Sequence, residues 1–252
     1  MIEINKIYLG DCIDIMKSID NESIDMILCD LPYGKTKSNF DIIIPIKDLW
    51  TEYKRIIKKN SAVVLTAIQP FSSMLVSTNY EMFKYEWIWN KKKPSNFLLS
   101  KVMPMMITET VLVFGYGKLK YNPQMTKGKL RDKSSNNSEK FKKIGHNGWG
   151  KVNFQQNDNI NDDYYPKNII EISNANQRNK LHPTQKPIEL FEYLIKTYTN
   201  EGDIVLDNCI GSGTTAITCN NLKRNFIGIE KDETYYNICL KRIDDNSNVF
   251  FS

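Results

Sequence analysis

The sequence predicts an α/β fold with a Rossmann-like, mostly parallel sheet and helices on both of its faces. The clearest support is a strand–helix–strand unit near the carboxyl terminus, with strands over 203–207 and 225–230 and a helix over 214–222, because such units connect parallel strands. A second observation is the apolar run 24–30, which ends in an acid and is followed directly by Leu-Pro-Tyr-Gly. This pattern is typical of a buried parallel strand with a loop at its carboxyl end.

The remaining elements continue this alternation. Pro187 can occupy the first position of a helix over 187–198, in which apolar residues recur at helical spacing. A last helix is predicted over 232–243. Short apolar runs predict further strands over 61–66, 85–89 and 110–114.

A basic region separates the two α/β parts. Between residues 116 and 151, ten lysines and arginines stand against two acids, a net charge of +8, whereas the whole chain of 252 residues carries +5. Such a charge run is usually a solvated loop, but it also fits the electrostatic footprint of a nucleic-acid partner. We therefore predict one main domain built from 1–115 and 181–252, with a basic insert over 116–180.

Composition argues against several classes of protein. No apolar stretch approaches the roughly 18 residues of a membrane span, and residues 1–6 lack the layout of a secretory signal. The five cysteines contain no Cys-x-x-Cys and only two histidines are present, so neither a disulfide framework nor a metal site is expected. These features predict a cytoplasmic protein without a metal or a membrane span.

The turn after Asp207 has the pattern of a cofactor loop. Residues 211–216 read Gly-Ser-Gly-Thr-Thr-Ala, and the acid Glu230 closes the next strand. Glycines allow the backbone to approach a ligand, and the helix amino terminus offers free N–H groups. The pattern indicates an adenosine-containing cofactor, either NAD or S-adenosylmethionine, or else a turn that only permits close helix–strand packing.

The turn that follows the strand 24–30 combines an acid, a proline and an aromatic ring. An exocyclic amine of a nucleobase is a poor nucleophile, and acceptors of its N–H bonds free its lone pair. A proline-stiffened turn can fix such acceptors, and a ring can stack on an extruded base. The alternative is an ordinary strand-end turn with a buried ring. The residues concerned are Asp30, Leu31, Pro32 and Tyr33.

Together these motifs resemble the β group of S-adenosylmethionine-dependent DNA amino methyltransferases, in which the catalytic motif precedes the cofactor loop in circularly permuted order. Residues 30–34 resemble the family's Asp-Pro-Pro-Tyr motif, residues 207–215 its cofactor loop, residues 182–187 (His-Pro-Thr-Gln-Lys-Pro) the segment before that loop, and residues 9–12 its Gly-Asp-Cys element. The sequence departs from the family at Leu31, whose carbonyl is retained, and at 209–210 in the loop.

The resemblance implies a role for each matching residue. Asp30 and the Leu31 carbonyl would hold the target amine, with Pro32 in the same turn, and Tyr33 would stack on the flipped base. The cofactor's adenine would contact Asp11, and its ribose would contact Glu230. Its methionine part would lie against the loop, with its carboxylate reached from the preceding segment. The residues implied there are Asp207, Asn208, Cys209, Gly211, Ser212, Gly213, Thr214 and Thr215, together with Thr184 and Lys186.

The expected partner is double-stranded DNA, recognised at a specific site through the insert. Phosphate contacts are expected from two basic clusters, one after the strand 85–89 and one in the insert. The resemblance further implies a homodimer and a cognate restriction endonuclease as candidate partners. The lysines concerned are Lys91, Lys92 and Lys93, and Lys140, Lys142 and Lys143.

Adenine N6 is the expected target because the motif begins with Asp30, whereas N4-cytosine enzymes of the family more often begin it with Ser. Methylation of cytosine at C5 would need a cysteine nucleophile after a proline, and no cysteine here follows a proline. N4-cytosine methylation and a non-catalytic DNA-binding module remain alternatives. An RNA base methyltransferase fits the motif order less well, and an NAD-dependent dehydrogenase would not explain residues 30–33.

Overall fold

The computed structural model describes residues 2–34, 42–94, 96–132, 160–174 and 185–249. These residues divide into two compact units, one formed by Met1–Asn122 with Lys167–Ser252 and the other by Pro123–Pro166. Thr184, Lys140, Lys142 and Lys143 lie outside the described residues.

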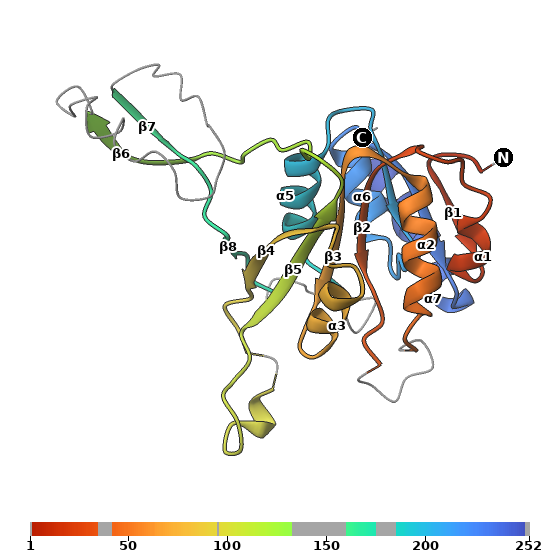
Figure 1. Cartoon of the computed structure of the whole chain (residues 1–252), viewed down its shortest axis with the longest axis horizontal. Helices are drawn as coiled ribbons and strands as arrows, with labels where there is room; N and C mark the ends of the chain where they lie inside the picture. Colours follow the sequence, from red (N-terminus) through yellow and green to blue (C-terminus); the bar gives the residue numbers. More distant parts are fainter. Residues whose placement is uncertain (1, 35–41, 95, 133–159, 175–184, 250–252) are drawn as a thin grey trace. The chain divides into compact units, whose positions relative to one another are not determined.

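The first unit contains an eight-stranded, mostly parallel sheet, as expected (Figure 1). Within it, β5 alone runs antiparallel to its two neighbours, β3 and β4. All other neighbours pair in parallel. The strands in order across the sheet are β1 (Lys6–Leu9), β10 (Asn225–Glu230), β9 (Ile204–Asp207), β2 (Ile24–Asp30), β3 (Ile57–Ala67), β5 (Thr108–Gly115), β4 (Phe83–Asn90) and β8 (Ile169–Glu171).

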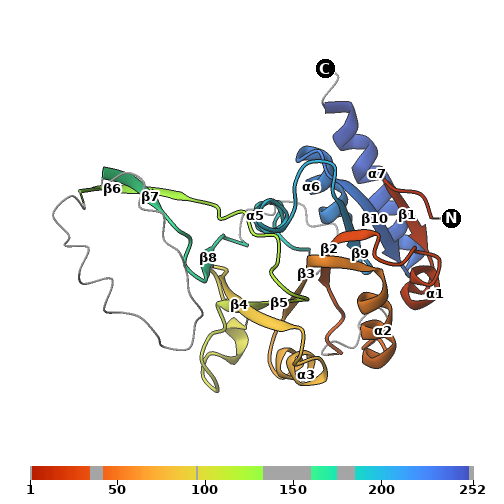
Figure 2. The same cartoon turned by 45° about the horizontal axis from the view of Figure 1, so that its top comes forward.

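Helices cover both faces of this sheet (Figure 2). One face packs against α1 (Cys12–Met16), α2 (Ile46–Ile56) and α3 (Phe71–Thr78). The other packs against α5 (Ile188–Tyr198), α6 (Thr214–Asn221) and α7 (Glu233–Val249). A short 3-10 helix, η1 (Phe97–Leu99), lies in the connection between β4 and β5.

Strand alternation assigns side chains to the two layers. In β2, Ile27 and Cys29 belong to the core under α1, α2 and α3, whereas Met26 and Leu28 belong to the core under α5, α6 and α7. Every residue of β2 before Asp30 is buried, which explains why its sequence is a nearly continuous apolar run.

The apolar stripe of α5 packs as its spacing predicts. Phe191, Leu194, Ile195 and Tyr198 are buried. The Tyr198 hydroxyl accepts a hydrogen bond from Trp87 Nε1 at 2.7 Å, so the polar tip of this ring is satisfied inside the core.

The second unit contains a two-stranded antiparallel sheet of β6 (Thr126–Asp132) and β7 (Ile160–Tyr164). Lys127 Nζ lies 2.7 Å from Asp162 and 2.9 Å from Asp163. This unit is shorter than the insert expected over 116–180, because β8 pairs with β4 in the main sheet. Asn122, just before the unit, is likewise attached to the first unit, since its backbone N–H donates to Thr197 O at 2.7 Å.

None of the described helices is long and apolar enough to cross a bilayer.

Candidate active site

Four acids follow neighbouring strands at one edge of the sheet. Because β1, β10, β9 and β2 are parallel, their carboxyl ends meet at the same edge, which is where ligands bind in open α/β sheets. Glu230, Asp207 and Asp30 close three of these strands, and Asp11 comes two residues after the fourth. The structure therefore brings together the expected catalytic turn and the expected cofactor loop.

The Asp30 carboxylate is held from both sides. Its Oδ1 accepts a hydrogen bond from the Tyr33 hydroxyl at 2.6 Å and another from the Thr66 hydroxyl. Its Oδ2 accepts from Lys186 Nζ at 2.7 Å. Thr66 is the register partner of Asp30 on β3, so the sheet itself fixes this contact. Leu31 is buried and Pro32 is partly buried beside it.

Tyr33 joins the catalytic turn to the core. Its ring lies 5.3 Å from the ring of Phe71, at the start of α3. Burial, followed by the nearby Asp30 carboxylate, raises the pKa of Tyr33 well above its ordinary value, so the hydroxyl stays protonated and can donate to Asp30 at neutral pH. The structure thus shows a polar contact of this residue that the stacking prediction did not include.

Two buried lysines and a glutamate form a series of ionic contacts that begins at Asp30. Lys186 Nζ lies 3.4 Å from Glu109 Oε2, and Lys91 Nζ lies 3.1 Å from Glu109 Oε1. Burial alone would lower the pKa of Lys186, but the Asp30 carboxylate, with support from Glu109, raises it above its ordinary value. The ammonium group of Lys186 therefore remains charged at neutral pH.

The cofactor loop begins with a buried carboxyl group. Asp207 Oδ1 accepts from Cys209 N at 3.1 Å, and Oδ2 accepts from the Thr215 hydroxyl. Burial raises the pKa of Asp207 to about 7, although both of these donors oppose the shift. Asn208 is buried, and its Oδ1 accepts from the Tyr53 hydroxyl. These bonds fix the loop to the strand and to α2.

Glycine is required at the start of α6. Gly213 has φ +86°, and an added Cβ would lie 2.6 Å from Cys239 Sγ, so a side chain would meet both backbone strain and a clash. Gly211 also has a positive φ, and its N–H donates to Glu230 Oε2 at 2.8 Å. Ser212 and Thr214 both accept from Arg242 of α7, at 3.0 to 3.3 Å.

Glu230 and Asp11 complete the acidic edge. Glu230 Oε1 accepts from the backbone N–H groups of Lys231 and Asp232, both at 2.9 Å. Burial raises the pKa of Glu230 despite these bonds. Asp11 caps α1 by accepting from Ile13 N at 3.0 Å, and Lys231 Nζ lies 3.2 Å from its other oxygen.

This edge fits S-adenosylmethionine. Carboxylates after three neighbouring strands suit a ligand with a positive sulfonium and donor hydroxyl groups. Glu230 accepts three N–H bonds, and a carboxylate has about four lone-pair positions, so an acceptor remains for a ribose hydroxyl. Gly213 is the N-cap of α6 and offers no side-chain hydrogen bond, so the first N–H groups of the helix suit a carboxylate.

Two lysines lie elsewhere than expected. Lys91 was expected at DNA phosphates, but its side chain is buried against Glu109. In this position its ammonium group is not exposed to a DNA phosphate. Lys186 was expected at the cofactor's carboxylate, and the structure pairs it with Asp30 instead.

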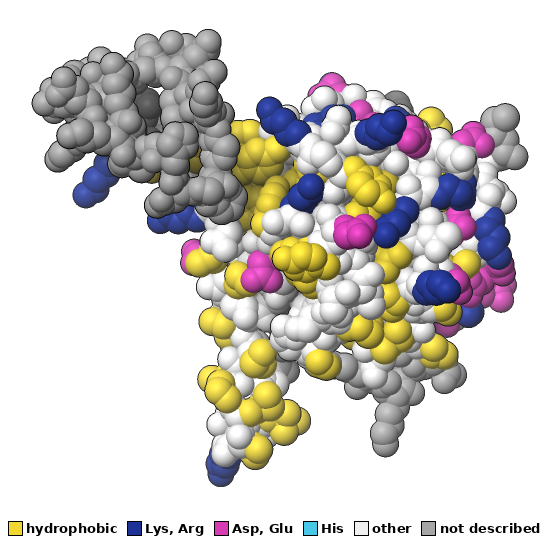
Figure 3. Space-filling model, viewed as in Figure 1, with side chains coloured by type: hydrophobic (Ala, Val, Ile, Leu, Met, Phe, Trp, Pro, Cys, Tyr) yellow, Lys and Arg dark blue, Asp and Glu magenta, His cyan; other side chains and the backbone are white. Residues whose placement is uncertain are grey.

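Lys92 and Lys93 are exposed, as a phosphate contact requires. They open the projecting segment between β4 and β5, on which exposed hydrophobic side chains gather (Figure 3).

Four residues of the site were not anticipated. Thr66 contacts Asp30 of the catalytic turn, and Glu109 contacts Lys186. Arg242 and Gln185 both contact Ser212 of the cofactor loop. The sequence could have indicated Thr66, because a parallel pairing of 24–30 with 61–66 places their last residues side by side. Nothing in the local sequence singles out Arg242.

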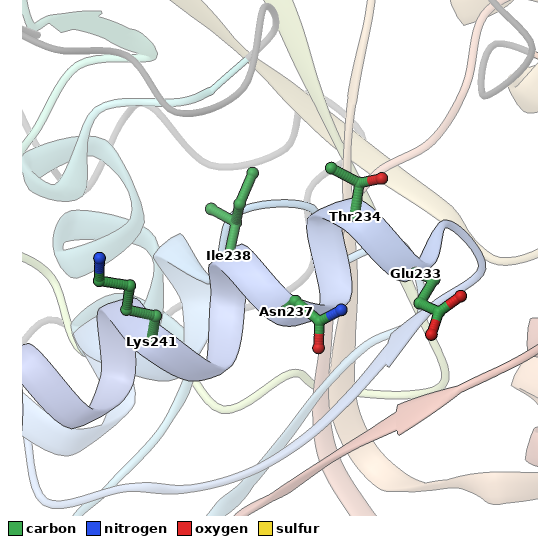
Figure 4. Close-up of a pocket in the computed structure, with 5 residues that line it drawn as sticks. All are labelled: Glu233, Thr234, Asn237, Ile238 and Lys241. Carbon is green, nitrogen blue, oxygen red and sulfur yellow. The ribbon is translucent and has the colours of Figure 1, made fainter.

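A separate pocket of about 470 Å³ lies along α7, lined by Glu233, Thr234, Asn237, Ile238 and Lys241 (Figure 4). All five belong to one helix, and none contacts Asp30 or the cofactor loop in the bonds described above.

The fold and the site are those of a Rossmann-like methyltransferase. A family model described as DNA methylase, covering N6 and N4 methyltransferases, matches residues 24–241. Relatives include the Type II methyltransferase M.HpaI of Haemophilus parainfluenzae, 26% identical over 98% of this chain and 76% of the relative. M1.MboII of Moraxella bovis is 27% identical, over 94% of this chain and 95% of the relative.

Solved structures agree. The M1.HpyAVI complex with SAM has 26% identity and a TM-score of 0.64, covering 95% of this chain and 98% of that chain. The PvuII DNA methyltransferase, described as cytosine-N4-specific, shares the fold with a TM-score of 0.66 at 16% identity, over 96% of this chain and 91% of that chain. The chain belongs to the DNA methylase family and is an S-adenosylmethionine-dependent DNA amino methyltransferase.

Proposed function

We propose that this methyltransferase modifies adenine N6 at a specific site in duplex DNA, after flipping the base out of the helix. The observation that carries the proposal is the Asp30 carboxylate at the end of β2, held by Tyr33, Thr66 and Lys186. Three donors occupy three of about four lone-pair positions of a carboxylate, which leaves one on Oδ2 for an amine N–H.

The chemistry of these residues is acceptance of hydrogen bonds. Asp30 and the Leu31 carbonyl take the two N–H bonds of the amine, which draws the nitrogen lone pair out of conjugation with the ring. S-adenosylmethionine supplies an electrophilic methyl group on a sulfonium. The amine nitrogen would form a bond to the methyl carbon as the carbon–sulfur bond breaks and its electron pair stays on sulfur, and the methylated nitrogen would then lose one proton to water.

The cofactor roles follow from the edge geometry. We assign the adenine contact to Asp11, the ribose contact to Glu230 and the methionine contact to the loop from Asp207 to Thr215. Thr184 stays a predicted contact to the cofactor's carboxylate. Lys186, paired with Asp30 in this structure, would reach that carboxylate only by leaving this partner.

A paired adenine is inaccessible to Asp30 inside a duplex, so the base must be extruded, with an unstacking and unpairing penalty of a few kcal/mol. Stacking on Tyr33 would recover about 1–3 kcal/mol of it. For DNA contact we propose Lys92 and Lys93 together with the basic insert, including Lys140, Lys142 and Lys143. The Type II names of the relatives support a cognate restriction endonuclease as a partner. A homodimer and a cytoplasmic location stay predictions.

N4-cytosine methylation is the second candidate. It uses the same amine chemistry, the family model covers both targets, and a cytosine-N4-specific enzyme shares the fold. The Asp that begins the catalytic motif favours adenine.

Mass spectrometry of nucleosides from methylated duplex DNA decides between these targets. N6-methyladenine is the expected product, whereas N4-methylcytosine alone would overturn the adenine assignment. Asp30→Asn is the control for mechanism, because it should abolish transfer while leaving S-adenosylmethionine affinity within a few-fold.

A further inference from the structure

Four charged groups of alternating sign contact one another in a row that ends at Asp30. They are Lys91, Glu109, Lys186 and Asp30, and the successive contacts between them are 3.1, 3.4 and 2.7 Å. The two lysine side chains are 5% and 8% exposed, and the two acids 15% and 18%. The row has no net charge, which is what burial of four ions requires.

The fold brings these groups together from four separate segments. Asp30 ends β2, Glu109 lies at the beginning of β5, Lys91 follows β4, and Lys186 precedes α5. Because side chains alternate along a strand, Asp30 lies on the same face of the sheet as Leu28, and Glu109 lies on the same face as Val111. Leu28 and Val111 pack in the core that includes the buried residues of α5. The row is therefore built by the sheet and does not depend on a mobile surface chain.

Lys186 poses an electrostatic problem for the proposed chemistry. As the amine nitrogen accepts the methyl group it becomes positively charged, and it would bind the same Asp30 oxygen that Lys186 already contacts at 2.7 Å. Two like charges sharing one carboxylate oxygen repel each other, and the repulsion is strong in a buried site. A counter-charge behind Lys186 would relieve it.

Glu109 is placed to supply that counter-charge. Its Oε2 is buried and accepts no hydrogen bond among the residues that the structure describes, yet it lies 3.4 Å from Lys186 Nζ. This oxygen can therefore draw the ammonium group toward itself as the amine engages Asp30. Its Oε1 is anchored by Lys91 at 3.1 Å, so the carboxylate is fixed in place.

We propose that Glu109 is a positioning residue of the methyl-transfer site, which balances the charge of Lys186 so that the Asp30 carboxylate can stabilise the positive nitrogen. Lys91 holds Glu109 in this position. The inference rests on the proposed amine chemistry at Asp30. It predicts that Glu109 acts on the transfer step and not on binding of the cofactor or of DNA.

The first test is Glu109→Gln, which keeps the shape of the side chain and removes its charge. The row then carries one net positive charge, and we expect kcat to fall about 10-fold or more. The dissociation constants for S-adenosylmethionine and for duplex DNA should stay within about 3-fold, since less than 1 kcal/mol separates such values. Unchanged kcat in a folded variant would overturn the proposal.

The second test restores neutrality without restoring Glu109. Lys91→Met combined with Glu109→Gln returns the row to zero net charge, so kcat should recover relative to Glu109→Gln alone. A purely structural role predicts the opposite, because the double variant loses two buried side chains. A double variant as slow as the single variant, or slower, would overturn the charge-balance argument.

Glu109→Asp covers the case in which the glutamine variant does not fold. It retains the charge, so it should keep more activity than Lys91→Met/Glu109→Gln, and less would contradict the proposal. Asp30→Asn separates the two levels of inference. If that variant retains turnover, the proposed amine chemistry fails; if it is inactive while Glu109→Gln is normal, only the role of Glu109 fails.

Discussion

Removal of the Tyr33 hydroxyl should slow methyl transfer while leaving the aromatic ring in place. In Tyr33→Phe, the 2.6 Å bond to Asp30 Oδ1 is lost. A hydrogen bond to a charged group contributes about 1.5–3 kcal/mol. Because about 1.4 kcal/mol corresponds to a factor of ten, kcat should fall about 10- to 100-fold if this bond holds Asp30 in its productive position.

Thr66 makes the prediction more specific, because its hydroxyl donates to the same oxygen. Thr66→Val should produce a smaller loss, and the double variant should not show additive losses, since the two donors share one acceptor. Single-turnover transfer of tritiated methyl groups measures the step itself, and calorimetry measures the affinity for S-adenosylmethionine, which should change little.

Tyr85→Phe is the matched control. Its hydroxyl contacts the Tyr198 hydroxyl at 3.1 Å and no site residue named above, so its kcat should match that of the wild type. Tyr33→Phe at the wild-type rate would refute the claim that the hydroxyl orients Asp30. Stacking would then be the remaining role of the ring.

Three further predictions concern stability and DNA affinity. Asp207 has a folded-state pKa of about 7, above its unfolded value, so the folded protein binds one more proton than the unfolded chain between pH 4 and 7. The free energy of unfolding should therefore decrease by up to about 4 kcal/mol as the pH rises from 4 to 7. In Asp207→Asn, the free energy of unfolding measured by denaturation should depend less on pH. Gly213→Ala should lose more stability than Gly202→Ala, because both have a positive φ but only Gly213 would clash; equal losses in thermal unfolding would exclude the clash. Lys92→Gln with Lys93→Gln should reduce the slope of log affinity for DNA against log salt by about two, and an unchanged slope would remove them from the interface.

The sequence predicted best those helices and strands that bury either one continuous side or all of their side chains. The strand 24–30 matches β2, and the helices over 187–198 and 214–222 match α5 and α6 to within one residue. The apolar spacing of α5 reflects packing on one side of the helix, and the nearly continuous apolar run of β2 reflects burial on both faces of the sheet, so each pattern has the same cause as the structure. The acids at the strand ends could be located for the same reason.

Other elements gave too little signal. β1 and β8 are four and three residues long, too short for a periodic pattern to stand out. β3 begins at Ile57, four residues earlier than expected, because Lys59 and Asn60 are exposed and interrupt the apolar run. Strand order also cannot be read from local pattern, so the antiparallel position of β5, and with it Glu109, was beyond reach.

The circularly permuted order of the motifs has no effect on the site, because adjacency in the sheet decides which groups meet. β2 pairs in parallel with β9, although about 180 residues separate their sequences, and Leu206 lies opposite Ile27. Asp30 and Asp207 therefore end neighbouring strands at one edge, whichever comes first in the chain. The second unit, Pro123–Pro166, lies between β5 and β8 in the chain, and its described strands β6 and β7 pair with each other and not with the sheet that carries the four acids. Under the proposed function, substitutions in this unit would alter DNA recognition while leaving unchanged the strand ends that carry Asp30 and Asp207.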